Sequence, residues 1–193
     1  MLTMFFTVFS QSSHIRNIKL KRPISARSII GDTDTTIFQS DLALAYSSFG
    51  HHASLINKSC KFYEYATYIQ DVDYAETKCK LHKNDFVMIQ VEDFDKSYAV
   101  IKAIFKHKGN DEQYYPFIYV DWFEDIHQSH DKLDCPLFFL CHNNTWRKIF
   151  PLPVVGGIQK THFVHDCTAQ CEKNSHDPNN NQYLKNDFFF KAI

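Results

Sequence analysis

The sequence predicts a mainly β fold, a single antiparallel domain of barrel-like form with irregular loops and a partly ordered N-terminal arm. The prediction rests first on three runs rich in Val, Ile, Phe and Tyr between residues 83 and 123, separated by polar turns at 92–96 and 108–113. It rests also on the alternation within the second run, which is typical of a half-buried strand. One face of that strand comprises Ala99, Ile101, Ala103 and Phe105, and the other comprises Tyr98, Lys102 and Lys106.

The length and charge of the chain limit its organisation and its partners. The 193 residues suffice for one domain with a substantial core, and we expect a basic, irregular arm over residues 1–53 and a β domain over 54–193. The formal net charge of −1 gives no global field that would draw the chain to nucleic acid or to a membrane surface. No apolar run approaches the ~20 residues of a membrane-spanning helix. Neither kind of partner is therefore predicted.

The N-terminal arm is basic between residues 14 and 27, and the first acidic residue of the chain is Asp32. Two interpretations of these charges remain open. The arm contacts phosphate groups or directs nuclear import, or it is an ordinary solvated tail, which the wide spacing of the charges favours. Residues 41–47 are expected to form a short helix. The basic residues are Arg16, Lys19, Lys21, Arg22 and Arg27.

The remaining elements are expected around the central meander. A strand at 60–69 precedes it, followed by an acidic connection at 71–76. After it come a polar loop or short helix at 124–134 and further strands at 136–141, 146–150, 159–167 and 187–193. The residues expected to be buried in the sheet are Val87, Ile89, Ile101, Phe105, Ile118 and Phe189.

The cysteines leave a second class of protein open. Six of them, at 60, 79, 135, 141, 167 and 171, permit a disulfide framework, and glycosylation sequons begin at Asn57 and Asn143. A secreted, disulfide-stabilised β protein is therefore an alternative interpretation. Reduced thiols are favoured, because a chain of this length can build a core without disulfides.

Several segments in order resemble a known family. The first three are Asn84-Asp-Phe-Val-Met-Ile, Ser97-Tyr-Ala-Val-Ile-Lys-Ala-Ile-Phe and Val120-Asp-Trp-Phe123. A looser match covers Pro153-Val-Val to Phe163-Val-His165 and then Asp187-Phe-Phe-Phe. Together they resemble the bromo-adjacent homology (BAH) domain over about residues 80–193. The chain departs from the family pattern at Asn84, where glycine is usual, and in its cysteine-containing segment before the last strand.

The resemblance implies a nuclear, chromatin-associated module that binds a histone tail or another nuclear protein without catalysis. In some members of the family an aromatic cage holds a methylated lysine. Carried over onto this sequence, the cage residues are Tyr98 and Trp122, and the acids Glu124 and Asp125 would supply the counter-charge. Ring faces attract methylated ammonium groups, which gives the cage its physical basis. The alternative is that Trp122 is a core residue and Tyr98 an ordinary residue of a strand face.

A Cys/His-rich excursion over residues 162–182 forms a second candidate site. In a strand, His165 and Cys167 point to the same side, and the chain then returns through Cys171 to His176. These four residues are expected to bind one structural zinc ion, because two sulfur and two nitrogen ligands complete a tetrahedral site. The alternative is a set of free thiols and surface histidines. A zinc-stabilised interaction protein of a mobile-element-like or other nuclear factor is therefore a further interpretation.

Catalysis is not predicted. His165 and Cys167 resemble a base and a nucleophile, but neighbours on one strand face seldom reach attack geometry, and no third orienting group is marked. The sequence also lacks a glycine-rich loop that would hold a phosphate, since Gly156-Gly157 is not followed by a helical pattern.

Overall fold

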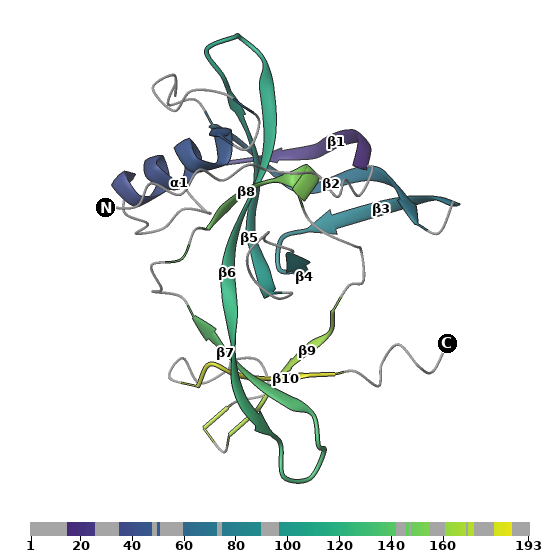
Figure 1. Ribbon diagram of the computed structural model, residues 1–193, viewed down its shortest axis with the longest axis vertical. Coiled ribbons are helices and arrows are strands. Elements are labelled where there is room, and N and C mark those ends of the chain that lie inside the picture. Colours follow the sequence, from purple (N-terminus) through teal and green to yellow (C-terminus); the bar gives the residue numbers. More distant parts are fainter. Residues whose placement is uncertain are drawn as a thin grey trace.

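The structure is a computed structural model, and it describes residues 15–25, 35–47, 50, 60–72, 75–89, 97–141, 146, 148–154, 161–168, 170–171 and 180–186. Figure 1 shows a long central strand, β6, that joins an upper part containing the helix to a lower part containing β7, β9 and β10. The elements are β1 (Ile15–Ile24), α1 (Thr35–Ser47), β2 (Cys60–Val72), β3 (Ala75–His82), β4 (Phe86–Ile89), β5 (Ser97–Lys108), β6 (Tyr114–Ser129), β7 (Pro136–Cys141), β8 (Ile149–Pro151), the 3-10 helix η3 (Leu152–Val154), β9 (Phe163–His165) and β10 (Gln182–Lys185).

The described strands form one antiparallel sheet. Its order is β1-β2-β5-β6-β7-β10-β9, while β3 pairs with β2, β4 with β5 and β8 with β6. The mainly β fold and its antiparallel pairing are therefore confirmed. The barrel-like form is only loosely met, because no pairing among the described strands joins β1 to β9 and the sheet stays open. No helix among the described residues is both long and apolar enough to cross a membrane.

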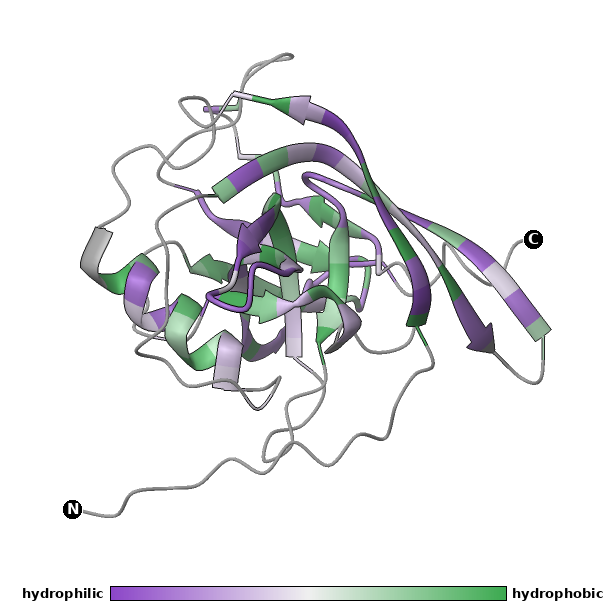
Figure 2. Cartoon of the chain, turned by 90° about the horizontal axis from the view of Figure 1, so that it is seen from above, coloured by the Kyte–Doolittle hydropathy of each residue, from purple (hydrophilic) through white to green (hydrophobic). Residues whose placement is uncertain are grey.

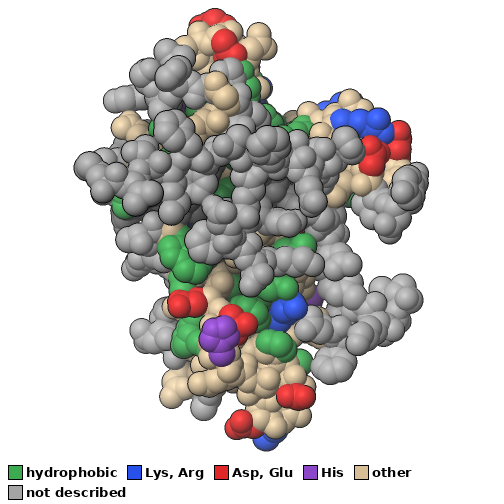
Figure 3. Space-filling view, in the orientation of Figure 1, with side chains coloured by type: hydrophobic (Ala, Val, Ile, Leu, Met, Phe, Trp, Pro, Cys, Tyr) green, Lys and Arg blue, Asp and Glu red, His purple; other side chains and the backbone are tan. Residues whose placement is uncertain are grey.

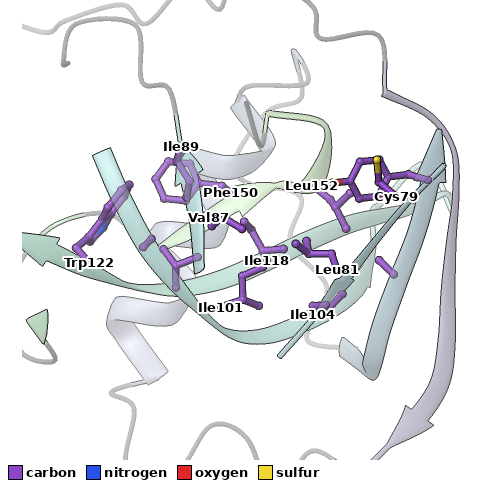
Figure 4. Close-up of a cluster of buried hydrophobic side chains, with 14 residues drawn as sticks. Cys79, Leu81, Val87, Ile89, Ile101, Ile104, Ile118, Trp122, Phe150 and Leu152 are labelled. Carbon is purple, nitrogen blue, oxygen red and sulfur yellow. The ribbon is translucent and has the colours of Figure 1, made fainter. Parts of the chain in front are cut away.

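The predicted central meander is present as β4, β5 and β6. The expected core residues Val87, Ile89 and Ile118 are buried, as are Ile101 and Phe105, whereas Phe189 lies outside the described residues. Figure 4 shows the larger core cluster, where side chains from β3 to β6 meet Phe150 and Leu152. Burial of each such side chain contributes about 1.5–3 kcal/mol of transfer free energy.

The prediction that Ala99, Ile101, Ala103 and Phe105 share one face of β5 is wrong. The register of β5 against β6 shifts between Ile101 and Ala103, which marks a bulge. Because one extra residue reverses the alternation of a strand, Ile101 and Ile104 pack in one core cluster. Ala103 and Phe105 pack in the other, which lies under the helix.

The prediction of an irregular arm over residues 1–53 does not hold for β1 and α1. Strand β1 pairs antiparallel with β2, with Leu20 opposite Ala66. Helix α1 buries Leu42 and Tyr46 against the aromatic core of the sheet. The Asp41 carboxylate accepts a hydrogen bond of 2.7 Å from the backbone N–H of Lys148, beside β8. Residues 15–24 and 35–47 therefore belong to the same folded body as the sheet, and a boundary at residue 53 does not describe them.

Other boundaries differ from those expected. The acidic connection at 71–76 is shorter, because β2 continues to Val72 and β3 begins at Ala75. The loop expected at 124–134 begins later, since β6 extends to Ser129. Part of the polar excursion forms β10, whereas the strand expected at 187–193 lies outside the described residues. Asn84, the departure from the BAH pattern, has φ of 69°, a conformation that glycine adopts freely and asparagine tolerates.

Candidate metal centre and exposed apolar face

Strand β9 carries His165, the first of the metal candidates, and its alternation anchors it to the core. Phe163 and His165 are buried, whereas Val164 between them is exposed. The Phe163 ring stacks parallel on Phe123 of β6 with 4.2 Å between centroids. Two residues further along the same face, the His165 ring meets the edge of Tyr183 in β10 at 5.1 Å. The core thus fixes where the imidazole lies.

The side chains of His165, Cys167 and Cys171 converge at the end of β9. Their ligand atoms all lie within 4.8 Å of one another, and His165 Nδ1 is 3.5 Å from Cys167 Sγ. A turn returns Cys171 to the site, closed by the hydrogen bond from Cys171 N to Thr168 O at 3.1 Å. The predicted parity of His165 and Cys167 is therefore present, and these three residues form a group that could hold a metal ion. His176, the predicted fourth ligand, lies outside the described residues.

Asn180 orients the imidazole, although no pattern in the sequence marks this residue. Its carbonyl oxygen lies 2.8 Å from His165 Nε2. Because a carbonyl can only accept, Nε2 carries the proton and the Nδ1 lone pair faces the cysteines. The Asn180 side chain donates to Asp166 O at 2.6 Å and accepts from Gln182 N at 3.1 Å. A backbone carbonyl that fixes the tautomer of a histidine is a usual neighbour of a metal ligand.

The protonation of the thiols would change if a metal cation bound beside them. Desolvation, and then the neighbouring Cys171, raise the pKa of Cys167 above its ordinary value. Without a cation the thiol therefore keeps its proton at neutral pH. A bound divalent metal reverses this preference, because the thiolate is the form that ligates. No disulfide joins any two of the six cysteines, all of which lie among the described residues.

The structure does not bring Tyr98 and Trp122 together. Tyr98 lies opposite Phe123 in the β5–β6 ladder, while Trp122 lies opposite Ala99. Residues directly opposite share a face and neighbours alternate, so the two rings lie on opposite faces of the sheet. Trp122 is 3% exposed and belongs to the core. The prediction that Tyr98 and Trp122 form one aromatic cage is therefore wrong.

The face of Tyr98 is occupied from within the chain. Its ring packs edge-on against Phe138 and Phe163 in a second aromatic cluster. The Lys185 Nζ lies 4.9 Å from its centroid. Asp125 lies opposite Phe138 on this side of the sheet, and its carboxylate accepts a hydrogen bond from the backbone N–H of His127. This lysine is the cation that the ring attracts in the described structure.

Trp122 supports a different exposed surface, on which Glu124 also lies. In the β6–β7 ladder Trp122 lies opposite Cys141 and Glu124 opposite Phe139, so all four side chains share one face. The Trp146 ring stands edge-on to Trp122 with 6.1 Å between centroids. Trp146 is 51% exposed and Phe139 39% exposed. We call this surface, made of Glu124, Phe139, Cys141 and Trp146, the Trp146 face.

Glu124 is held in position on the Trp146 face. Its carboxylate accepts a hydrogen bond from the Cys141 thiol, with 3.4 Å between sulfur and oxygen. Desolvation, and then this bond, raise the pKa of Cys141. In Figure 3, apolar and acidic side chains lie together over the lower half of the molecule, where β6 and β7 run. Sequence reasoning missed Phe139 and Trp146. The alternation of residues 136–141 could have revealed Phe139, because it places this side chain on the other face of the strand from Phe138 and Leu140.

Comparison with protein-family models and with curated proteins finds no match to this chain. The resemblance to the BAH domain thus remains a prediction from the sequence segments.

Proposed function

We propose that this chain is a nuclear, chromatin-associated protein-binding module of BAH-like kind, which binds a basic peptide such as a histone tail on the Trp146 face. One observation carries the proposal. Glu124 lies directly opposite the exposed Phe139, two residues along β6 from the buried Trp122, whose ring the exposed Trp146 meets edge-on. The order of the matching segments along β4, β5 and β6 supports the family interpretation.

The chemistry of the Trp146 face suits a lysine-rich peptide. A lysine ammonium, methylated or not, gains about 0.5–2 kcal/mol over an aromatic face, with tryptophan the strongest ring. Glu124 supplies a carboxylate on the same face, two residues along β6 from Trp122. Phe139 offers apolar surface to a neighbouring side chain. The acid of the original cage hypothesis is thus kept, while Trp146 replaces Tyr98 as the accessible ring.

Binding of a histone-tail peptide to the full chain tests this role. We expect tryptophan fluorescence and calorimetry to detect a trimethyl-lysine peptide, with affinity reduced at least tenfold by Trp146→Ala or Glu124→Gln. Leu133→Ala is the matched control, because Leu133 is a similarly exposed apolar residue in the β6–β7 turn. Loss of affinity in the control equal to that in Trp146→Ala, or no binding of any histone tail, contradicts the proposal.

We propose further that His165, Cys167 and Cys171 bind one structural zinc ion, with His176 as the fourth ligand. Nitrogen and sulfur donors are the set that zinc prefers, and four protein ligands are typical of a structural site. The ion would hold the end of β9 against the turn at Cys171 and so maintain the strands beside the Trp146 face. No catalytic step is assigned to it.

Metal content measures this assignment directly. Full-length protein purified without chelator should contain one zinc per chain by plasma mass spectrometry. Cys171→Ser and His165→Ala should remove it, and His176→Ala should weaken its retention. His162→Ala is the matched control, because His162 lies in the same segment and bonds Asn186 but does not belong to the cluster of His165, Cys167 and Cys171. Zinc absent from the unaltered chain, or lost equally in the control, would rule the site out.

A further inference from the structure

One face of the sheet, across β1, β2 and β3, carries basic residues in register. Lys21 lies opposite Tyr65, which lies opposite His82, and in the next row Lys19 lies opposite Thr67 and Lys80. Directly opposed residues share a face, so these side chains lie on one surface. The residues between them, such as Ala66 and Leu81, are buried in the core. Figure 2 shows this alternation of hydrophilic and hydrophobic residues along the curved strands.

The surface continues onto the start of β2 and the adjoining ends of β5 and β6. Lys61 lies opposite Lys106, and Lys106 lies opposite Pro116, two residues from the exposed Tyr114. We call the whole surface the basic face. Its lysines are Lys19, Lys21, Lys61, Lys78, Lys80 and Lys106.

Positive charge is in excess on the basic face. Among the described residues, its lysines form no ion pair within 4 Å. Two acids, Asp71 and Glu76, lie where β2 ends and β3 begins, and both are paired with Arg16. Near the start of β2, the Glu64 carboxylate is paired with the Arg22 guanidinium, with 3.3 Å between nitrogen and oxygen. The overall charge of −1 therefore conceals a surface whose lysines pair with none of the acids that the structure describes.

Aromatic rings are interleaved with these lysines. The Lys80 Nζ lies 4.2 Å from the Tyr65 centroid, and the Lys106 Nζ lies 4.5 Å from the Tyr114 centroid. Tyr65 is half-buried, so its ring is held in place while part of it meets solvent. A lysine over an exposed ring is held more weakly than a stacked nucleobase. A base can therefore displace the ammonium, which then meets the phosphate beside that base.

We propose that the basic face binds single-stranded nucleic acid, with Tyr65 and Tyr114 as stacking platforms and the surrounding lysines as phosphate contacts. An extended sheet surface with aromatic rings among basic residues is the combination by which sequence-tolerant single-strand binders work. A membrane surface or an acidic peptide uses the charges alone and gains little from the ordered rings. The site lies apart from the Trp146 face and does not depend on it.

Fluorescence polarisation of the full chain with fluorescein-labelled oligo(dT) of about 16 nucleotides, the upper site size of sheet-based modules, tests the proposal. Lys80→Glu and Lys78→Glu should each weaken binding about tenfold and reduce the slope of log K against log salt by roughly 0.7 per lost contact. Lys132→Glu is the charge-matched control, because Lys132 is exposed in the β6–β7 turn, far along the sheet. It should bind as the unaltered chain does.

Ring variants separate stacking from charge. Tyr65→Leu should weaken binding roughly five- to one-hundred-fold, as loss of one stacked base does, without changing the salt slope, and Tyr65→Phe should restore it. The proposal is overturned if oligo(dT) does not bind at low salt, if Lys132→Glu is as damaging as Lys80→Glu, or if Tyr65→Leu has no effect. Preferential binding of polyglutamate or phosphatidylserine vesicles over oligo(dT) overturns it too. Thermal melts of each variant confirm that the fold is intact.

Discussion

Truncation of Leu42 in helix α1 distinguishes the structure from the arm expected over residues 1–53. Leu42 is 2% exposed and packs against Phe105 and Phe117, both fully buried. Leu42→Ala therefore leaves a cavity that the aromatic rings beside it cannot easily fill. The free energy of unfolding should fall by about 2–5 kcal/mol, which lowers Tm by roughly 4–20 °C for a chain of this size.

Leu44 supplies a control two residues away in the same helix. It is 45% exposed, and the change Leu44→Ala alters helix propensity as much as Leu42→Ala does. Its effect should stay within about 0.5 kcal/mol. Urea denaturation followed by circular dichroism measures both variants. If both variants unfold at the same urea concentration as the unaltered chain, α1 is not docked, and the arm interpretation holds for this segment.

Two further substitutions and one alkylation measurement probe groups that are wholly or partly buried. Tyr46→Phe removes the hydroxyl that lies 2.6 Å from Nδ1 of the buried His107, so urea denaturation should show a loss of about 1–3 kcal/mol. Lys148→Met removes an ammonium 3.3 Å from the buried Asp121 carboxylate, and the thermal melt should report a loss of about 2–4 kcal/mol. Burial raises the pKa of Cys60 to about 11, so mass spectrometry should find it unalkylated by iodoacetamide at pH 8 until the chain is unfolded.

The central meander could be predicted because its signal is local. Period-2 alternation and polar turns specify β4, β5 and β6 without knowledge of any distant residue. The bulge between Ile101 and Ala103 could not, since an extra residue in a strand leaves the composition of the run unchanged. Only the pairing with β6 shows that the core face changes at this point.

Long-range pairing also explains why the sequence around β1, read alone, predicts an irregular arm. Its apolar residues Ile18 and Leu20 are few, and lysines surround them. They pack against the core only because β2, some forty residues later, brings Ala66 and Tyr68 into that cluster. The same pairing aligns the lysines into the basic face, which the overall net charge had concealed.

The two candidate sites differ in how far their residues lie apart. His165, Cys167 and Cys171 are close in sequence, so strand parity and one turn were enough to predict their convergence. Tyr98 and Trp122 lie on different strands, and their relative side depends on register. With Tyr98 opposite Phe123, an offset of one residue places Trp122 on the other face.

Removal of the proposed metal should loosen one end of the sheet and leave the other intact. His165 ends β9, and two residues before it Phe163 stacks on Phe123 in the core. Without an ion, the end of β9 is held by its bonds to Asn180 and by its pairing with β10, so β9 and β10 become the least stable part of the described sheet. Hydrogen exchange after chelation should accelerate at residues 163–166 and 182–185, while β5 and the first half of β6 stay protected. Cys171→Ser should reproduce the pattern and His162→Ala should not. Exchange that rises equally across both ends of the sheet, or at neither, contradicts a metal that acts locally on β9.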